Sequence, residues 1–323
     1  MPLLRFIPET TNVDFVKYRW VAFAIDGLLV VVSVISIFWH GFNLGIDFTG
    51  GVLMEVKAPQ VADVGKIRSD IISLGFNDPV VQTYGGAGCD TPAGSCVMIR
   101  VQPRAAAPGV DPNKAEQASV QSIKDKLGNA YQYRSTEVVG PKVSSELLND
   151  GILATILAVA MISAYVAVRF EWQYGVGALI ATGHDVFVTA GFFSVLQLDF
   201  NINTVASLLL LAGYSINDTV VVFDRIRENR RKYKRMSLPD MINLSTNQIA
   251  TRTTLVSAAT ALSVVPLLFG GPVLLNFSVA ILFGIVVGTF SSTYVAAALL
   301  LYLPAVGGRV DSKPDGKAEE APA

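Results

Sequence analysis

A single carboxylate inside an apolar run is the feature of this sequence with the clearest chemistry. The segment "LLLLAGYSINDTVVVFDRIRENRRKYKR", residues 208–235, places Asp218 among leucines and valines and then ends in a dense basic run. In the middle of a membrane helix an aspartate costs about 2.5–3.5 kcal/mol, and its short side chain cannot reach the membrane surface as a lysine can. A carboxylate kept there is usually paired, hydrated or protonated, so Asp218 is a candidate for proton binding.

The neighbours of Asp218 predict which way it faces. Ser215 and Asp218 are the polar centre of a stripe that recurs every third or fourth residue, with Asn217 beside them. We expect this stripe to face other helices rather than lipid, and to need a second six-span subunit to cover it. Its members are Ser207, Leu211, Ser215, Asp218 and Val222.

Arg252 and Asp185 are the side chains elsewhere in the chain that could act on Asp218. Each lies in another apolar run, Asp185 next to His184. A carboxylate near an arginine favours its charged form, whereas an isolated one in an apolar environment favours its neutral form. A site that alternates between these states takes up and releases a proton. The residues alone leave two interpretations open: Asp218 and Arg252 form a static ion pair, or they take part in proton transfer. Asp185 either joins this site or only holds neighbouring helices together.

The composition predicts a membrane protein. Of the 323 residues, 51% are hydrophobic and 16% are charged, and the mean hydropathy is +0.47. This balance is typical of a multi-pass membrane protein and argues against a water-soluble globule. With two cysteines and two histidines we expect no metal site, and we expect no nucleic-acid partner. No cleavable signal peptide is expected, since a polar lead precedes the first apolar run and no A-x-A-like site follows it.

Six apolar runs predict six membrane helices. A spanning helix needs about 20 mostly apolar residues. The fifth run is short, but joining it to the sixth would leave about 50 residues for one crossing, which is too many. The predicted spans are 20–40, 151–168, 174–196, 202–223, 253–269 and 273–303.

Basic residues fall on alternate connections and so predict the orientation. Lysines and arginines occur in segment 1–19, at Arg169, seven times within 225–235, and in the tail 304–323. The connections "QLDFNIN" and "GGP" have none. The positive-inside rule then places both termini in the cytoplasm and residues 41–150 outside.

The external segment 41–150 has the rhythm of a small α+β domain. Alternating strands and helical spacing follow the order βαββαβ, which is that of a ferredoxin-like unit. The stretch "CDTPAGSC" lies at the tip of its hairpin. In an oxidising compartment Cys89 and Cys96 could close this loop as a disulfide; two free thiols are the alternative.

The remaining polar segments are given simpler roles. Spans two to six occupy 151–303, and the basic loop at 224–250 is predicted to contain a short amphipathic helix on the cytoplasmic face, capped by Ser237. The tail 304–323 is expected to be disordered. Asp26 lies nearer the cytoplasmic edge of the first span, and we expect it to be interfacial.

Five motifs together resemble the SecF family of membrane proteins. They lie in order along about residues 15–305: "NLGIDFTGG", "VGPKVSSEL", "HDVF", "GYSINDTVVVFDRIREN" and "NQIATRT". The fourth motif is the most specific. "VSSEL" departs from the family, which more often has glycine after the valine.

The resemblance implies a fold of the resistance-nodulation-division type and a complex with SecD, and through it with the SecYEG channel and YajC. It implies a bacterial inner-membrane protein that helps unfolded polypeptide into the periplasm late in export, with the proton gradient rather than a cofactor as energy source. Asp218 in "SINDT" resembles the family's proton-path carboxylate, and Arg252 in "ATRT" resembles its cationic partner. We place Ser215, Asn217 and Asp185 in the same pathway.

Three rival interpretations were weighed. An intramembrane aspartyl protease could use Asp185 and Asp218 as a dyad. However, the Gly-x-Gly-Asp motif of such proteases is absent before Asp218, so we expect no enzyme. A proton-driven small-molecule exporter of the same superfamily is the alternative function, although such exporters usually need two six-helix halves. A passive scaffold leaves Asp218 and Arg252 unexplained.

Overall fold

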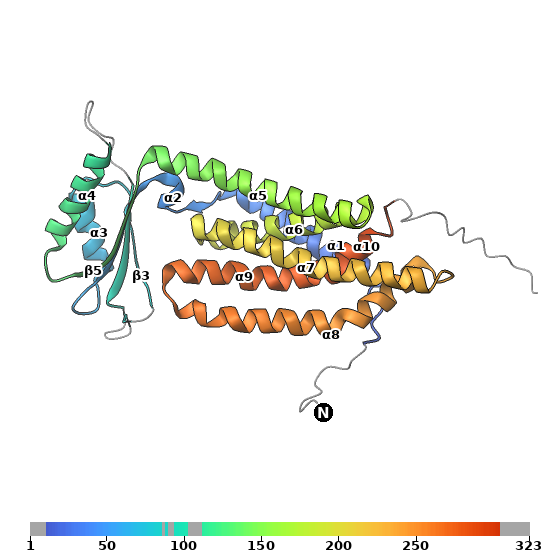
Figure 1. Ribbon diagram of the computed structural model, residues 1–323. Helices are drawn as coiled ribbons and strands as arrows, with labels where there is room; N and C mark the ends of the chain where they lie inside the picture. The colour runs from blue at the N-terminus through green and yellow to red at the C-terminus, as the bar shows by residue number, and fades with distance from the viewer. Residues whose placement is uncertain (1–10, 86–87, 90–93, 103–111, 304–323) are drawn as a thin grey trace, which may run out of the picture.

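The computed structural model describes residues 11–85, 88–89, 94–102 and 112–303. Within these residues six helices are long and apolar enough to cross a membrane, which confirms the predicted number of spans (Figure 1). The predicted tail 304–323, the first ten residues and the hairpin tip 90–93 lie outside the described residues. The spans are built from α1 (Arg19–Trp39), α5 (Pro141–Arg169), α6 (Trp172–Leu196), α7 (Ile202–Lys232), α8 (Leu238–Val264) with η1 (Val265–Phe269), and α9 (Pro272–Phe290) with η2 (Ser291–Ala296) and α10 (Ala297–Leu299).

Local sequence signals fix the ends of these helices. The α1 helix has 21 residues, about 31 Å at 1.5 Å per residue, which matches the hydrocarbon core of a bilayer. Asn201 begins α7 with a capping box, since its side chain accepts from the Thr204 amide and the Thr204 side chain accepts from the Asn201 amide. Pro141 begins α5 at a position where the missing amide hydrogen is tolerated.

The amphipathic helix predicted within 224–250 is not a separate element. α7 continues to Lys232, and α8 starts after the Ser237 cap and runs without a break into the fifth span. No glycine occurs between Leu238 and Val264, and the one proline, Pro239, stands in the first turn, so nothing interrupts the helix.

The domain predicted to lie outside the membrane, called the external domain below, is a four-stranded antiparallel sheet with the strand order β3-β4-β2-β5. α3 and α4 cover one face of the sheet (Figure 1). Alternate residues of β2 point into the core, where Met54 and Val56 meet Ile67 and Ile123. This arrangement confirms the predicted ferredoxin-like unit. Its elements are β2 (Gly51–Lys57), α3 (Val64–Ser73), β3 (Val80–Thr83), β4 (Cys96–Val101), α4 (Pro112–Leu127) and β5 (Gln132–Val139).

Cys89 and Cys96 are joined by a disulfide, with their Cα atoms 5.4 Å apart. The bond closes the hairpin between β3 and β4. Nη1 of Arg134, on β5, lies 2.9 Å from Cys89 Sγ. That the mature protein carries this bond in the cell remains a prediction, which free-thiol labelling of unreduced, unfolded protein can check.

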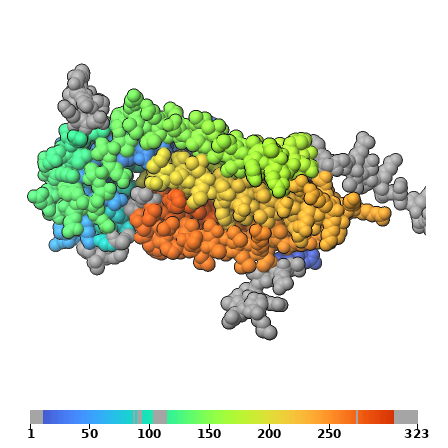
Figure 2. All heavy atoms as spheres, in the orientation of Figure 1, coloured from blue at the N-terminus to red at the C-terminus, as the bar shows by residue number. Residues whose placement is uncertain are grey.

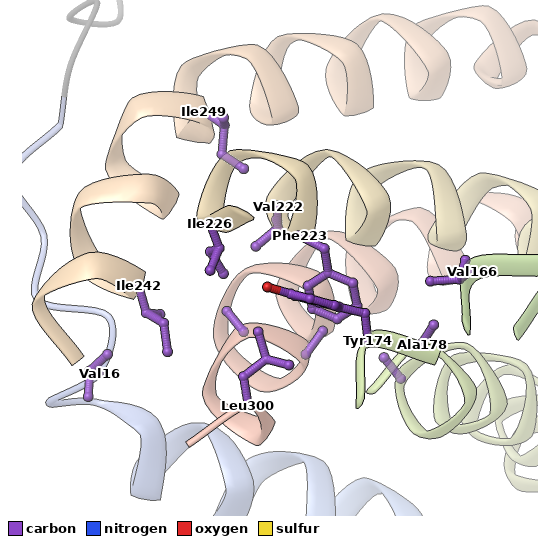
Figure 3. Close-up of a cluster of buried hydrophobic side chains, with 13 residues drawn as sticks. Val16, Val166, Tyr174, Ala178, Val222, Phe223, Ile226, Ile242, Ile249 and Leu300 are labelled. Atoms are coloured by element: carbon purple, nitrogen blue, oxygen red, sulfur yellow. The ribbon is translucent and has the colours of Figure 1, made fainter. Parts of the chain in front are cut away.

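The molecule is elongated, with the external domain at one end of the helix bundle (Figures 1 and 2). The largest cluster of buried apolar side chains in the bundle lies toward the other end, where Tyr174 of α6 packs against Phe223 of α7 with ring centroids 5.1 Å apart (Figure 3). Ile242 and Leu300 belong to the same cluster, so α8 and the end of the sixth span are fixed around α7.

Candidate functional site

Asp185 is fully buried at the centre of the bundle and has three hydrogen-bond partners. Its Oδ2 accepts from Ser215 Oγ of α7 at 2.5 Å and from Ser291 Oγ of η2 at 2.8 Å. Its Oδ1 lies 3.0 Å from Nδ1 of His184. Three elements therefore meet on one carboxylate, and the predicted association of Asp185 with Ser215 is present in the geometry.

The close approach of the sixth span to Asp185 depends on two local features. η2 is a π-helix, a distortion often found at functional sites, and it carries Ser291. Gly288 lies one turn earlier, where an added Cβ would come within 3.3 Å of Asp185 Oδ2. A larger residue would separate α9 from the carboxylate. The Ser291 contact was missed in the sequence, because a π-helix has no clear sequence signal.

Asp218 lies one turn along α7 from Ser215 and is 3% exposed. Its surroundings differ from those of Asp185. Oδ2 of Asp218 has no hydrogen-bond partner among the described residues, whereas Ser257 and Arg252 of α8 both act on the carboxylate. Ser257 also bonds to Tyr214 Oη, at 2.8 Å. A buried carboxylate oxygen without a donor is energetically expensive, so a proton bound to this atom would remove part of that cost.

Arg252 is exposed and lines a cavity of about 650 Å³ beside α5, α7 and α8. The wall of this cavity includes Val221, about one turn of α7 from Asp218. Within the part of the chain that the structure describes, no contact of 4.0 Å or less pairs Asp218 with Arg252. Arg252 and Asp218 therefore form no direct ion pair among the described residues, and the arginine influences the carboxylate from a longer distance.

The structure separates one predicted site residue from the others and corrects the placement of a second carboxylate. Asn217 is exposed on the outside of α7, whereas Ser215 and Asp218 lie on its buried face. Asp26 is not interfacial, since it is 5% exposed and its Oδ1 lies 4.0 Å from Nε2 of His184. The position of Asp26 along α1 predicts a place near the membrane edge. Its spacing from Ala22 and Ser33, on the buried side of α1, indicates instead that it faces the bundle.

The expectation that a partner must cover the polar stripe of α7 is also wrong. Ser207, Ser215 and Asp218 are each at most 3% exposed in this chain alone. α9 packs closely enough that a Cβ added at Gly284 would overlap the side chain of Leu211. The chain buries its own functional groups.

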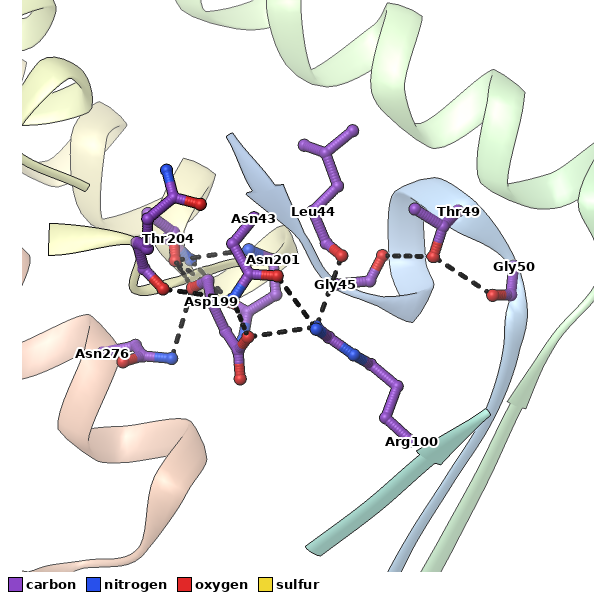
Figure 4. A network of polar contacts seen from close by, with 11 residues as sticks. Asn43, Leu44, Gly45, Thr49, Gly50, Arg100, Asp199, Asn201, Thr204 and Asn276 are labelled. Atoms are coloured by element: carbon purple, nitrogen blue, oxygen red, sulfur yellow. Dashed lines mark hydrogen bonds and ion pairs between the residues drawn. The ribbon is translucent and has the colours of Figure 1, made fainter. Parts of the chain in front are cut away.

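The external domain is fixed to the start of α7 by a polar network (Figure 4). Arg100 of β4 donates to Asp199 Oδ1 at 3.0 Å, to Asn43 Oδ1 at 2.9 Å and to the Leu44 carbonyl at 3.3 Å. Asn43 and Asp199 are themselves paired in the short parallel strands β1 (Asn43–Leu44) and β6 (Asp199–Phe200). α7, the helix that carries Ser215 and Asp218, therefore begins at the network that contacts the external domain.

Asp47 adds a second contact, because its Oδ2 accepts from the amide of Ile202, the first residue of α7. Burial first, and then the carboxylates of Asp47 and Glu55, raise the pKa of Glu137 on β5. The junction thus combines an arginine-centred network with a group of acidic side chains on the facing sheet.

The six spans, the ferredoxin-like domain between the first two and the buried carboxylates define a multi-pass membrane protein with its candidate functional groups inside the helix bundle. The family model "Protein export membrane protein SecD/SecF, C-terminal" matches residues 119–305, and "SecD/SecF GG Motif" matches residues 35–58. The chain belongs to the SecD/SecF family.

Curated relatives agree over nearly the whole chain. The protein translocase subunit SecF of Rickettsia bellii (strain OSU 85-389) is 38% identical over 92% of this chain and 95% of its own length. The subunit of the same name from Rhodobacter capsulatus is 39% identical, over 93% and 91% respectively. That of Pseudomonas aeruginosa is 37% identical, over 90% and 92%.

Solved structures show the same fold. The crystal structure of SecDF from Thermus thermophilus, a translocon-associated membrane protein, matches with a TM-score of 0.78 and 33% identity. The match covers 93% of this chain but only 39% of that one. SecDF in its super-membrane-facing form matches with a TM-score of 0.64 over 94% of this chain.

Proposed function

We propose that this chain is a translocase subunit that works with a SecD-type six-span partner and uses the proton gradient to promote late steps of protein export. In this proposal it catalyses no reaction itself and needs no cofactor. It lies in the bacterial inner membrane with both termini in the cytoplasm and its ferredoxin-like domain in the periplasm, and it acts beside the SecYEG channel and YajC on unfolded polypeptide.

The observation that carries the proposal is the contrast between Asp218 and Asp185. Asp185 has hydrogen-bond partners on both oxygens, whereas Asp218 is buried with one oxygen unpartnered among the described residues. Arg252 of α8 and Arg225 of α7 border a cavity whose wall also includes Val221, about one turn of α7 from Asp218. A proton that enters from this end meets Asp218 as the first buried group able to accept it.

Proton binding at Asp218 changes how α7 and α8 attract each other. When ionised, the carboxylate is attracted by Arg252 and held by Ser257, both on α8. When protonated, it loses the charge that Arg252 attracts. Because α7 starts at the network that holds the external domain, a change in its packing is passed to that domain.

Replacing Asp218 with asparagine tests this proposal. The Asp218→Asn side chain keeps the volume and hydrogen-bonding groups but cannot be titrated. Because Arg252 is exposed and not in direct contact, we expect the variant to fold, insert and accumulate normally. In inverted membrane vesicles it should lose most of the gradient-dependent gain in export, while ATP-driven export persists. Arg252→Met should lose the same gain.

Asp150→Asn is the matched control, because Asp150 is an exposed carboxylate near the start of the second span. It should keep the full gain at equal protein levels. If Asp218→Asn vesicles keep the full gradient-dependent gain, Asp218 does not carry the proton and the proposal is wrong.

A further inference from the structure

α1 touches the bundle through one narrow stripe, and Asp26 is the carboxylate in it. The buried residues of α1 are Ala22, Asp26, Ser33 and Ser36, while most of its larger side chains are exposed. Ser36 bonds to Ser194 of α6 at 2.9 Å, and Ser33 lies against Gly191. Small residues bring the two helices close, and the carboxylate of Asp26 is carried into this contact.

Asp26 faces the imidazole of His184, whose other side faces Asp185. Nε2 of His184 lies 4.0 Å from Asp26 Oδ1, and Nδ1 lies 3.0 Å from Asp185 Oδ1. Among the described residues, neither oxygen of Asp26 nor Nε2 of His184 has a hydrogen-bond partner. The imidazole therefore stands between one carboxylate that is fully hydrogen-bonded and one that is not.

The charges that act on Asp26 and His184 come from within this cluster. The charges that reach His184 are those of Asp26, on α1, and Asp185, on α6. α7 and η2 contribute the hydroxyls of Ser215 and Ser291, which are neutral. With a neutral imidazole the cluster would bury two negative charges without a cation, which is strongly unfavourable in a membrane interior.

We propose that Asp26, His184 and Asp185 together bind one proton at the α1–α6 contact, as a second proton site of the bundle distinct from Asp218. With the proton on the imidazole, a cation lies between the two carboxylates and the buried charge falls from two to one. The 4.0 Å between Nε2 and Asp26 is within ion-pair range but longer than a hydrogen bond, so proton binding draws α1 toward α6.

The second site is linked to the first through Ser215. Its hydroxyl donates to Asp185, and it stands three residues before Asp218 on the buried face of α7. A change of charge at the α1–α6 contact therefore alters the hydrogen bond that holds α7 beside Asp218. This link to export rests on the proposed function, whereas proton binding at His184 does not.

The chain offers a direct measurement, because its two histidines are His40 and His184. His40 is exposed at the end of α1, and His40→Gln leaves His184 as the one source of a ¹⁵N-histidine signal. In the full-length protein in lipid nanodiscs, the ring nitrogens of His184 should change from neutral to protonated shifts between about pH 9 and pH 5. Asp26→Asn should move the midpoint to lower pH by about one unit or more, because it removes a nearby opposite charge.

Ser36→Ala is the matched control. It removes a hydroxyl contact between the same two helices without removing a charge, so the His184 midpoint should stay unchanged. An imidazole that stays neutral over the whole range, or a midpoint that is the same with Asp26→Asn, would overturn the proposal. If Asp218→Asn loses the export gain but Asp26→Asn leaves the midpoint of the His184 titration unchanged, only the second proton site is disproved. If Asp218→Asn keeps the full gradient-dependent gain in export, the proposed function is disproved. The titration of His184 then still decides whether the second proton site exists.

Discussion

Gly191 shows how much the α1–α6 contact depends on single atoms. A Cβ added there would overlap Ser33 Cβ and Oγ and lie 2.9 Å from Ser33 Cα, so α1 itself must move. We expect Gly191→Ala to lower the stability of the bundle by about 1–3 kcal/mol, the usual cost of overpacking. Thermal unfolding of the purified protein in one detergent measures this as a lower Tm.

Gly183 provides the comparison on the same helix. A Cβ there meets no atom within 4 Å, and alanine favours the helix by up to about 1 kcal/mol. Gly183→Ala should therefore keep or raise the Tm. Equal Tm values for the two variants would show that α1 is not held against α6 at Ser33.

At this scale the helical period predicted the core of the site and little beyond it. Ser215 and Asp218 share a face because steps of three and four residues require it, and both are buried. Asn217 was included because it adjoins Asp218 in the sequence, but adjacent helix positions point about 100° apart. The approach of Ser291 to Asp185 and of Asp26 to His184 depends on how separate helices pack, which the sequence of a single segment does not encode.

At the scale of elements, the Arg100 network links the external domain to the start of α7. Arg100 and Asp199 are 12% and 19% exposed, and Arg100 also serves Asn43 and Leu44. Arg100→Met leaves Asn43 Oδ1 and the Leu44 carbonyl without this donor, while Asp199 Oδ1 keeps the bond from Asn43 Nδ2. The loss should cost about 1–3 kcal/mol locally. Spin labels at Ser69 of α3 and Leu262 of α8 should then report a broader distance distribution between domain and bundle.

Lys126→Met is the control for this prediction. It breaks a 3.7 Å ion pair with Asp70 in the same domain, but both side chains are substantially exposed. Such pairs contribute about 0–1 kcal/mol, so the distance distribution should not change. A narrow distribution in Arg100→Met would mean that β1, β6 and the Asp47 contact hold the domain without Arg100.

Most elements could be predicted because their hydrophobic periods are clear. The alternation of β2 and the six apolar runs each have a single structural solution. The helix that begins at the Ser237 cap, within 224–250, is predicted to lie on the cytoplasmic face because its sequence is amphipathic. Its polar groups are in fact used inside the protein, as when Asn247 binds the amide of Val13 at 2.8 Å. Composition alone cannot distinguish water from a protein partner.

At the scale of the whole molecule, α7 has a second stripe that this chain leaves uncovered. Ala206, Leu210, Gly213 and Asn217 are exposed and separated by steps of four, three and four. Figure 2 shows α7 reaching the surface between α5 and the helices α8 and α9. Small residues let another helix approach closely, and an amide facing lipid is unfavourable, so this stripe suits a protein neighbour rather than lipid.

The neighbour we expect on this stripe is the SecD-type subunit. This protein covers only 39% of the matched SecDF chain, so most of the SecDF chain has no counterpart in this one. A photoreactive phenylalanine analogue at Leu210, in full-length protein in native membranes, should crosslink to that subunit, which mass spectrometry identifies. The same analogue at Leu262, 72% exposed on α8, is the control and should react with lipid. Asn217→Leu should reduce co-purification of the partner without lowering the Tm of this chain. Crosslinks from Leu210 only to further copies of this chain, or to lipid as at Leu262, would show that the uncovered face of α7 is not the contact.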